Sequence, residues 1–371
     1  MRHLAEYRDA AQVAALVRRI RARSTRPWRI MEVCGGQTHG LLRNGLVEAL
    51  AGAVEFLHGP GCPVCVTPAD VIDQACALAG EPNTVVASYG DMLRVPGTQL
   101  SLWQARGRGA QVRILYSPLD AVTWAARSPE TRFVVLAVGF ETTAPATALA
   151  VLQAAQLGLT NFQVLTAHVR VLPVMEQLLS APDCPVQAFL AAGHVCTVTG
   201  FTSYAPLVSR YQCPIVVTGF EPVDLLRGIE ECVNQLEAGR SELVNCYDRS
   251  VQPQGNPDAL RLVEEVFEVA EGDWRGLGQV RAGCLRLRDA YGAFAAHSQQ
   301  PAADADSSGE CPLGPLLLGQ IRPVDCQHFG SRCTPNSPLG PPMISSEGAC
   351  AAWYVSRRQP VPRPGQPAES S

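Results

Sequence analysis

Lysine is absent from this sequence: all 30 basic residues are arginine. The absence excludes the chemistries that need an amine side chain, because P-loops, kinase sites and Schiff-base cofactors each use a lysine. The sequence also lacks a run of about 18 apolar residues, which a membrane helix needs. Its N-terminus has neither the apolar core nor the cleavage site of a signal peptide. We therefore expect a cytoplasmic protein without a membrane segment.

Net charge and chain length further restrict the class of protein that this sequence can encode. The 34 acidic residues outnumber the basic ones and leave a net charge of −4, which argues against a nucleic-acid partner. With 371 residues, of which 47% are hydrophobic, the chain can form two or three domains. In a reducing compartment its 14 cysteines are expected to be buried thiols, metal ligands or redox centres rather than structural disulfides.

Short apolar runs alternate with helical stretches along most of the chain, after an N-terminal helix at about residues 4–23. This alternation predicts an α/β fold of parallel sheets covered on both faces. The predicted strands are Arg29–Val33, Val54–Leu57, Thr84–Ser88, Val112–Tyr116, Phe133–Val138, Phe162–Ala167, Val186–Ala191 and Ile215–Thr218.

Two segments, Val135–Pro145 and Val216–Leu225, share a strand, the tripeptide Gly-Phe-Glu and a helix start. This weak repeat predicts two α/β units of the Rossmann-like kind. The predicted division is an N-terminal helix that packs on the third domain (1–28), two α/β domains (29–124 and 125–225), a mainly helical and irregular third domain (226–354) and a disordered tail (355–371). Within the third domain, the polar residues 297–310 are predicted to form a mobile linker.

Four cysteines near the C-terminus form a group spaced C-x14-C-x6-C-x16-C. Their segment is rich in turn residues and poor in apolar periodicity, so it needs a cross-link in order to fold. Four thiolates hold either zinc or an iron–sulfur cluster, and the wide, irregular spacing favours a cluster over a zinc ribbon. Two disulfides and four unrelated buried thiols are weaker alternatives. The residues are Cys311, Cys326, Cys333 and Cys350.

A C-x-x-C pair, Cys62 and Cys65, lies where a loop meets a predicted helix. The positive end of a helix dipole lowers the pKa of nearby thiols and favours redox chemistry. We interpret the pair as a redox-active dithiol. The alternative is half of a zinc site, for which the sequence offers no second pair.

A further cysteine, Cys34, follows a predicted strand and precedes two glycines, at the sheet edge where α/β proteins build their sites. Such a thiol binds metal or acts as a nucleophile, and His39 is a candidate base or proton relay about one helical turn away. A plain buried cysteine is the alternative. Three more polar residues at strand ends are candidates for the same cleft, namely Asp91, Glu141 and His194.

Several long motifs occur in one order from about Glu32 to Tyr354: EVCGGQTH, GPGCPVCVTP, YGDMLRVPG, GFETTAP, AAGHV, GFEP and DCQHFGSRCTPNSPLG…SSEGACAA. Together they resemble the HypD family of nickel–iron hydrogenase maturation factors. The resemblance implies two α/β domains and a third domain with a 4Fe-4S cluster, and it favours iron over zinc at the four C-terminal cysteines. It also implies that Cys34 binds the iron of an Fe(CN)2CO centre and that Cys62 and Cys65 are redox-active.

The same resemblance implies partners. A HypC-type chaperone would supply a second thiolate to the iron, and HypE with HypF would deliver cyanide made from carbamoyl phosphate. The role would be that of an assembly scaffold with redox activity. Two other functions stay open: a stand-alone iron–sulfur-dependent thiol–disulfide reductase acting through Cys62 and Cys65, and an interaction protein stapled by zinc.

Overall fold

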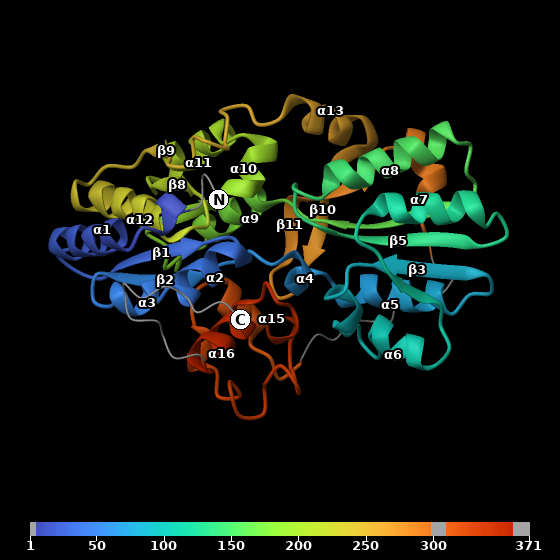
Figure 1. The fold of residues 1–371 in the computed structure, drawn as a ribbon, viewed down its shortest axis with the longest axis horizontal. Helices are drawn as coiled ribbons and strands as arrows, with labels where there is room; N and C mark the ends of the chain where they lie inside the picture. Colours follow the sequence, from blue (N-terminus) through green and yellow to red (C-terminus); the bar gives the residue numbers. More distant parts are fainter. Residues whose placement is uncertain (1–4, 298–308, 359–371) are drawn as a thin grey trace.

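Two parallel sheets with helices on their faces form most of the computed structural model, which describes residues 5–297 and 309–358 (Figure 1). The α/β class predicted from the strand pattern is confirmed. The predicted linker (297–310) and tail (355–371) lie for the most part outside the described residues. In the part of the chain that is described, no helix is both long and apolar enough to cross a membrane.

The first sheet has the strand order β2-β1-β7-β8-β9. Alternate side chains of its strands enter two apolar layers, one against α1 and α12 and the other against α9, α10 and α11. The strands are β1 (Trp28–Glu32), β2 (Val54–His58), β7 (Ala188–Ala192), β8 (Ile215–Thr218) and β9 (Leu243–Asn245). The helices are α1 (Ala10–Arg23), α9 (Val171–Ser180), α10 (Gly193–Thr199), α11 (Ala205–Tyr211) and α12 (Pro222–Glu237).

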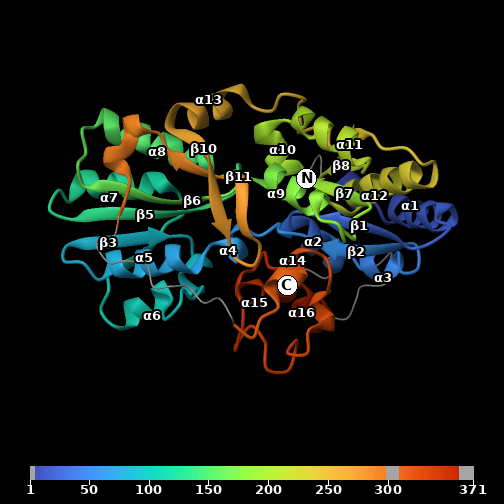
Figure 2. The ribbon, with the colours of Figure 1, turned by 180° about the vertical axis from the view of Figure 1, so that it is seen from behind.

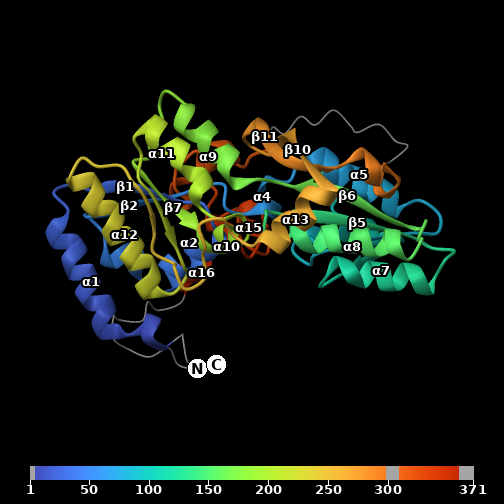
Figure 3. The same cartoon turned by 90° about the horizontal axis from the view of Figure 1, so that it is seen from above.

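The second sheet has the order β4-β3-β5-β6, and Figure 3 shows it beside the first, with α1 at one end of the molecule and α7 near the other. Helices α7 and α8 cover one face, and α5 and α6 cover the other. The strands are β3 (Thr84–Ser88), β4 (Val112–Ile114), β5 (Arg132–Gly139) and β6 (Phe162–His168). The helices are α5 (Ala69–Ala79), α6 (Leu102–Gly107), α7 (Pro118–Arg127) and α8 (Ala144–Gln156).

The sheets divide the chain differently from the predicted consecutive units 29–124 and 125–225. The first sheet contains β1 and β2 together with β7–β9, and the second contains β3–β6. The chain leaves the first sheet after β2, completes the second and returns at β7. A buried apolar run shows that a strand is central in a parallel sheet, but it does not show which sheet.

The prediction of a mainly helical region after residue 225 is wrong for residues 267–287. There an antiparallel hairpin, β10 (Phe267–Trp274) and β11 (Gly278–Leu287), follows α13 (Pro257–Val266). The tight turn of the hairpin uses Gly276 and Gly278, both with positive φ. The predicted N-terminal helix is present as α1, with the short η1 (Ala5–Arg8) before it, and it packs on α12 of the first sheet.

Residues 309–358, which we call the cysteine-rich module, lie below the junction of the two sheets in both Figure 1 and Figure 2. The module contains turns, isolated β-bridges and short helices, which are α14 (Leu313–Leu317), η5 (Pro323–Asp325), α15 (Pro341–Ile344) and α16 (Ala349–Arg358). Its helix α16 packs on α2 (Gly35–Arg43), where Trp353 and Ala352 bury Leu42. The module thus rests on the helix that follows Cys34.

Candidate functional site

Cys34 ends the β1–α2 connection and is almost fully buried. Its sulfur lies 3.4 Å from Nε2 of His194, the second residue of α10. Strands β1 and β7 are neighbours and parallel, so the residues after their carboxyl ends meet. The His194 ring stacks on Phe220, with centroids 4.8 Å apart. The structure therefore brings two of the predicted site residues, Cys34 and His194, into direct contact.

Burial dominates the electrostatics of this contact. It raises the pKa of the Cys34 thiol to about 12, and the nearby carboxylate of Glu32 contributes in the same direction. It also lowers the pKa of His194. Both groups are therefore neutral, and the imidazole is placed to accept a proton from the thiol.

His39 and Asp91 make their hydrogen bonds with the cysteine-rich module. The Nε2 atom of His39 contacts the carbonyl oxygen of Ser346, on the cysteine-rich module, rather than the Cys34 sulfur. The carboxylate of Asp91 accepts hydrogen bonds from the Ser346 backbone N–H (2.8 Å) and hydroxyl (2.6 Å). Ser346 of the module is therefore bound from both sheet units: by His39, which follows a strand of the first sheet, and by Asp91, which follows a strand of the second.

Glu141 lies at the turn after β5, where its carboxyl Oε1 accepts a hydrogen bond from the Val171 N–H at 3.0 Å. Its Oε2 atom is buried without a hydrogen-bond partner. Burial raises the pKa of Glu141 to about 7, and the charge of Arg170 opposes the shift. Glu141 thus belongs to the contact between the β5–α8 turn and α9, and these contacts do not include the sulfur of Cys34.

Cys62 and Cys65 form a disulfide at the start of the short α4 (Pro63–Val66). Both are buried, and they line a small pocket together with His58 and Glu347. The loop that carries them touches Cys34: the Gly35 N–H donates to the Gly61 carbonyl at 3.0 Å, and a Cβ on Gly61 would lie 2.2 Å from the Cys34 nitrogen. Gly61 thus permits the close approach between the disulfide loop and Cys34.

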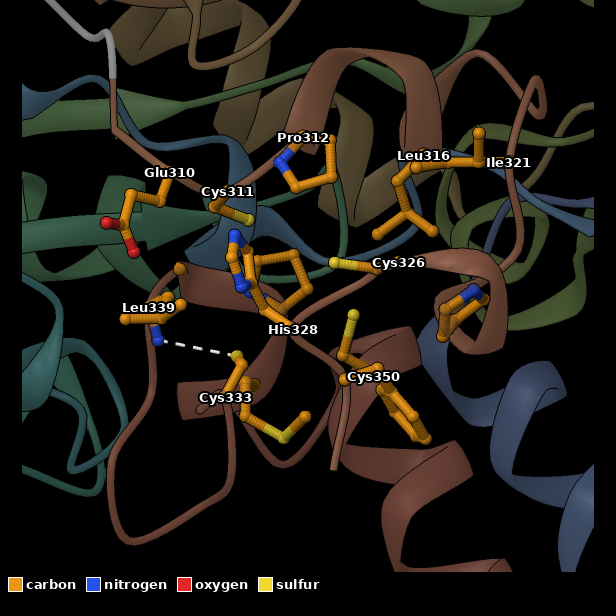
Figure 4. A pocket seen from close by; sticks show the side chains of 15 residues that line it. Glu310, Cys311, Pro312, Leu316, Ile321, Cys326, His328, Cys333, Leu339 and Cys350 are labelled. Atoms are coloured by element: carbon orange, nitrogen blue, oxygen red, sulfur yellow. Dashed lines mark hydrogen bonds between the residues drawn. The ribbon is translucent and has the colours of Figure 1, made fainter. Parts of the chain in front are cut away.

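The four C-terminal cysteines line one pocket, which is partly open to solvent and has mostly apolar neighbours (Figure 4). Burial and the other thiols raise the pKa of Cys311 to about 12 and that of Cys350 well above its usual value. A Cβ on Gly340 would lie only 2.3 Å from the sulfur of Cys311, so this glycine makes room for that side chain.

These sulfurs share a pocket without converging on one point. Within residues 5–297 and 309–358, no three His, Cys, Asp or Glu side chains are arranged to hold a metal ion as they stand. Figure 4 shows the Cys311, Cys326 and Cys350 sulfurs directed into the same space, while the Cys333 sulfur accepts the Leu339 N–H. Four soft donors spread around one cavity suit a multi-iron cluster better than a single ion.

Comparison with known proteins identifies the family. The family model described as "HypD: Hydrogenase formation hypA family" matches residues 10–357. The chain belongs to the HypD family. The resemblance of its motifs to this family is thereby confirmed across nearly the whole chain.

The sequences of named relatives align with this chain over nearly their whole length. The hydrogenase expression/formation protein HupD of Azotobacter chroococcum mcd 1 is 44% identical over 97% of this chain and 98% of its own. The hydrogenase maturation factors HypD of Azotobacter vinelandii and of Escherichia coli (strain K12) are 43% and 42% identical, each over 97% of this chain and 98% and 99% of their own. A solved Vibrio cholerae domain matches with a TM-score of only 0.14 and does not bear on the fold.

In this HypD-family chain, several residues that lie around Cys34 were not identified from the sequence motifs. Glu32 and His58 lie opposite each other in the register of β1 and β2, and both are buried. Trp353 of α16 reaches the same place from the cysteine-rich module. The available signal was Glu32 itself, an acid inside an otherwise apolar run. Its partners depend on strand register and on module docking, which motif spacing does not reveal.

Proposed function

We propose that this chain is a scaffold that assembles the Fe(CN)2CO centre of nickel–iron hydrogenases together with a HypC-type chaperone. Iron is the substrate and is held by Cys34, with a thiolate of the chaperone as the second protein ligand. A HypE-type donor, working with HypF, supplies the cyanide groups. The relatives' names support hydrogenase maturation, and the residues around Cys34 support the more specific role.

The observation that carries the proposal is the contact of Cys34 with His194 in a buried setting beside the disulfide loop. A soft thiolate is a suitable ligand for iron that carries strong-field ligands. His194 accepts the proton that leaves Cys34 when the sulfur binds iron. The buried position keeps bulk water away from the sulfur, which favours metal–thiolate bonding over hydration.

The disulfide supports a redox role. Reducing the Cys62–Cys65 bond takes two electrons and two protons and yields two thiols, and the reverse reaction returns both electrons. Cys311, Cys326, Cys333 and Cys350 would hold a 4Fe-4S cluster, which when bound exchanges single electrons.

The disulfide pocket and the four-cysteine pocket are neighbours. Both are lined by Leu316 and Pro342, which therefore separate them by little more than a side chain. Such proximity is what electron exchange between a cluster and a dithiol requires.

A stand-alone thiol–disulfide reductase is distinguished by disulfide-reductase turnover without any iron-ligand bands. Cys62 is 5% exposed, Cys65 1% and Cys34 3%, so a partner protein reaches any of these sulfurs only after a rearrangement. A zinc-stapled interaction protein is distinguished by metal analysis: about four iron atoms and their sulfide per chain support the cluster, and zinc alone contradicts it.

Infrared spectroscopy of the anaerobically copurified complex with the HypC-type chaperone tests the proposal. We expect bands from bound cyanide and carbon monoxide in the wild type and their loss in Cys34→Ala. The matched control is Cys184→Ala, a half-buried free cysteine in the loop before β7, which should keep the bands. Unchanged bands in Cys34→Ala would refute the role given to Cys34.

A further inference from the structure

A buried chain of hydrogen bonds connects Cys34 to the cysteine-rich module. The backbone N–H of Cys34 donates to Oε2 of Glu32 at 2.9 Å, and Nδ1 of His58 lies 2.7 Å from Oε1 of the same carboxylate. Nε1 of Trp353 donates to Nε2 of His58, also at 2.7 Å. Each of these residues is at most 8% exposed. The chain therefore runs entirely through the interior.

The direction of these bonds is set by Trp353. An indole N–H can only donate, so Nε2 of His58 must be the acceptor and its Nδ1 must carry the proton. His58 is consequently a neutral imidazole that donates to Glu32. Glu32 in turn accepts from His58, from the Thr38 hydroxyl and from the Cys34 N–H. Every member of the chain has its partner, and removing one leaves a buried polar group unsatisfied.

Glu32 lies at the base of the Cys34 loop, where both of its carboxyl oxygens accept hydrogen bonds. Within the described residues, its hydrogen-bond partners are the Cys34 amide, the Thr38 hydroxyl and the neutral His58, none of which carries positive charge.

Trp353 lies one helical turn after Cys350 on α16. The same short helix thus carries one of the four cysteines of the module and the hydrogen-bond donor that orients His58. We propose that Trp353, His58 and Glu32 are positioning residues that hold Cys34 ready for iron only while α16 is docked. This inference rests on the proposed function for its iron-binding part. Outer groups that orient a metal ligand in this way typically change metal affinity by about 10- to 100-fold.

The test compares two tryptophan substitutions in the full chain, copurified with its HypC-type partner. Trp353→Phe keeps the aromatic packing on α2 but deletes the N–H donor. Trp28→Phe is the matched control, because the Trp28 indole also donates at 2.7 Å, to Glu237, at the opposite end of β1. Glu32→Gln is a second variant, which preserves size but replaces one accepting oxygen by an N–H2 group.

Two measurements are made on each protein. The first is hydrogen exchange at the Cys34 amide, which we expect to be about fivefold faster in Trp353→Phe and unchanged in Trp28→Phe, as for the loss of one hydrogen bond. The second is the infrared intensity of iron-bound cyanide and carbon monoxide, which we expect to fall about tenfold in Trp353→Phe and Glu32→Gln. Iron and sulfide at the four-cysteine site should stay at the wild-type level.

The outcomes separate this inference from the proposed function. The inference is overturned if Trp353→Phe keeps both the wild-type exchange rate at the Cys34 amide and the wild-type infrared bands. It is also overturned if the amide exchanges faster but the bands of iron-bound cyanide and carbon monoxide stay at their wild-type intensity and position. If the four-cysteine site also loses its iron, the module itself has been disturbed and the specific coupling is contradicted. A wild-type complex without any bands contradicts the proposed function instead, and the exchange rates then still decide whether these residues hold Cys34.

Discussion

The buried carboxyl of Glu141 should make the stability of this protein fall with rising pH. Burial holds the pKa of Glu141 at about 7 in the folded chain, against 4.5 for the free side chain. Between these values the folded state keeps a proton that the unfolded state has released, so the free energy of unfolding decreases as the pH rises through this window. Each pH unit is worth about 1.4 kcal/mol, which gives a total of about 3 kcal/mol.

Replacing Glu141 by Gln removes the ionisation and keeps the size of the side chain. The amide oxygen can still accept from the Val171 N–H, as Glu141 does in the structure. We therefore expect Glu141→Gln to match the wild type near about pH 4 and to be more stable by about 3 kcal/mol near about pH 8. Urea unfolding of both proteins at several pH values measures the difference, in which titrations elsewhere in the chain cancel.

Glu176→Gln is the control, since that carboxylate is 46% exposed and pairs with Arg210 on the surface. Its substitution should change the free energy of unfolding by less than about 1 kcal/mol at any pH. A wild-type minus Glu141→Gln difference that is the same at low and high pH would show that the carboxyl is not protonated in the folded protein, and the reasoning would be refuted.

Two further substitutions test the packing around the site. Gly61→Ala should lower the free energy of unfolding by about 2 kcal/mol, because its Cβ would lie 2.2 Å from the Cys34 nitrogen, in backbone that cannot move aside. Asp224→Asn should cost about 3 kcal/mol, because the buried carboxylate makes two hydrogen bonds to Arg249, and the amide keeps only one accepting oxygen and no negative charge. Both are measured as shifts in the urea midpoint.

Matched controls accompany these two substitutions. Gly107→Ala meets no atom within 4 Å and should be neutral or slightly stabilising. Asp258→Asn breaks an exposed pair with Arg261 and should cost less than about 1 kcal/mol. If each site variant costs no more than its control, the close approach at Gly61 or the buried pair at Asp224 does not contribute as described.

The sequence was sufficient to predict individual strands and motifs, because these depend on local patterns. All eight predicted strands correspond to strands of the structure, within a few residues at their ends. The membership of those strands in two interleaved sheets was not predictable, since β1 and β7 are far apart in the chain and nothing local records their pairing. The hairpin after α13 was missed because the amphipathic helix runs directly into β10.

The site shows the same limit. Cys34 and His194 were each identified from their places at strand ends, but their contact depends on β1 and β7 being neighbours. His39 was the expected partner of Cys34 because it is close in sequence, and the structure turns it toward Ser346 instead. Glu32 meets His58 only through strand register. In each case, contacts between distant parts of the chain, rather than residue type, determine which side chains meet.

The central claim is that one chain carries two kinds of iron site. Mössbauer spectroscopy tests it most directly, on complex that has been enriched in the iron isotope that this method detects. We predict two iron species in the wild type: low-spin iron that disappears in Cys34→Ala while the cluster iron stays, and cluster iron that disappears in Cys326→Ala. A single species in the wild type, or a low-spin signal that survives in Cys34→Ala, would contradict the account.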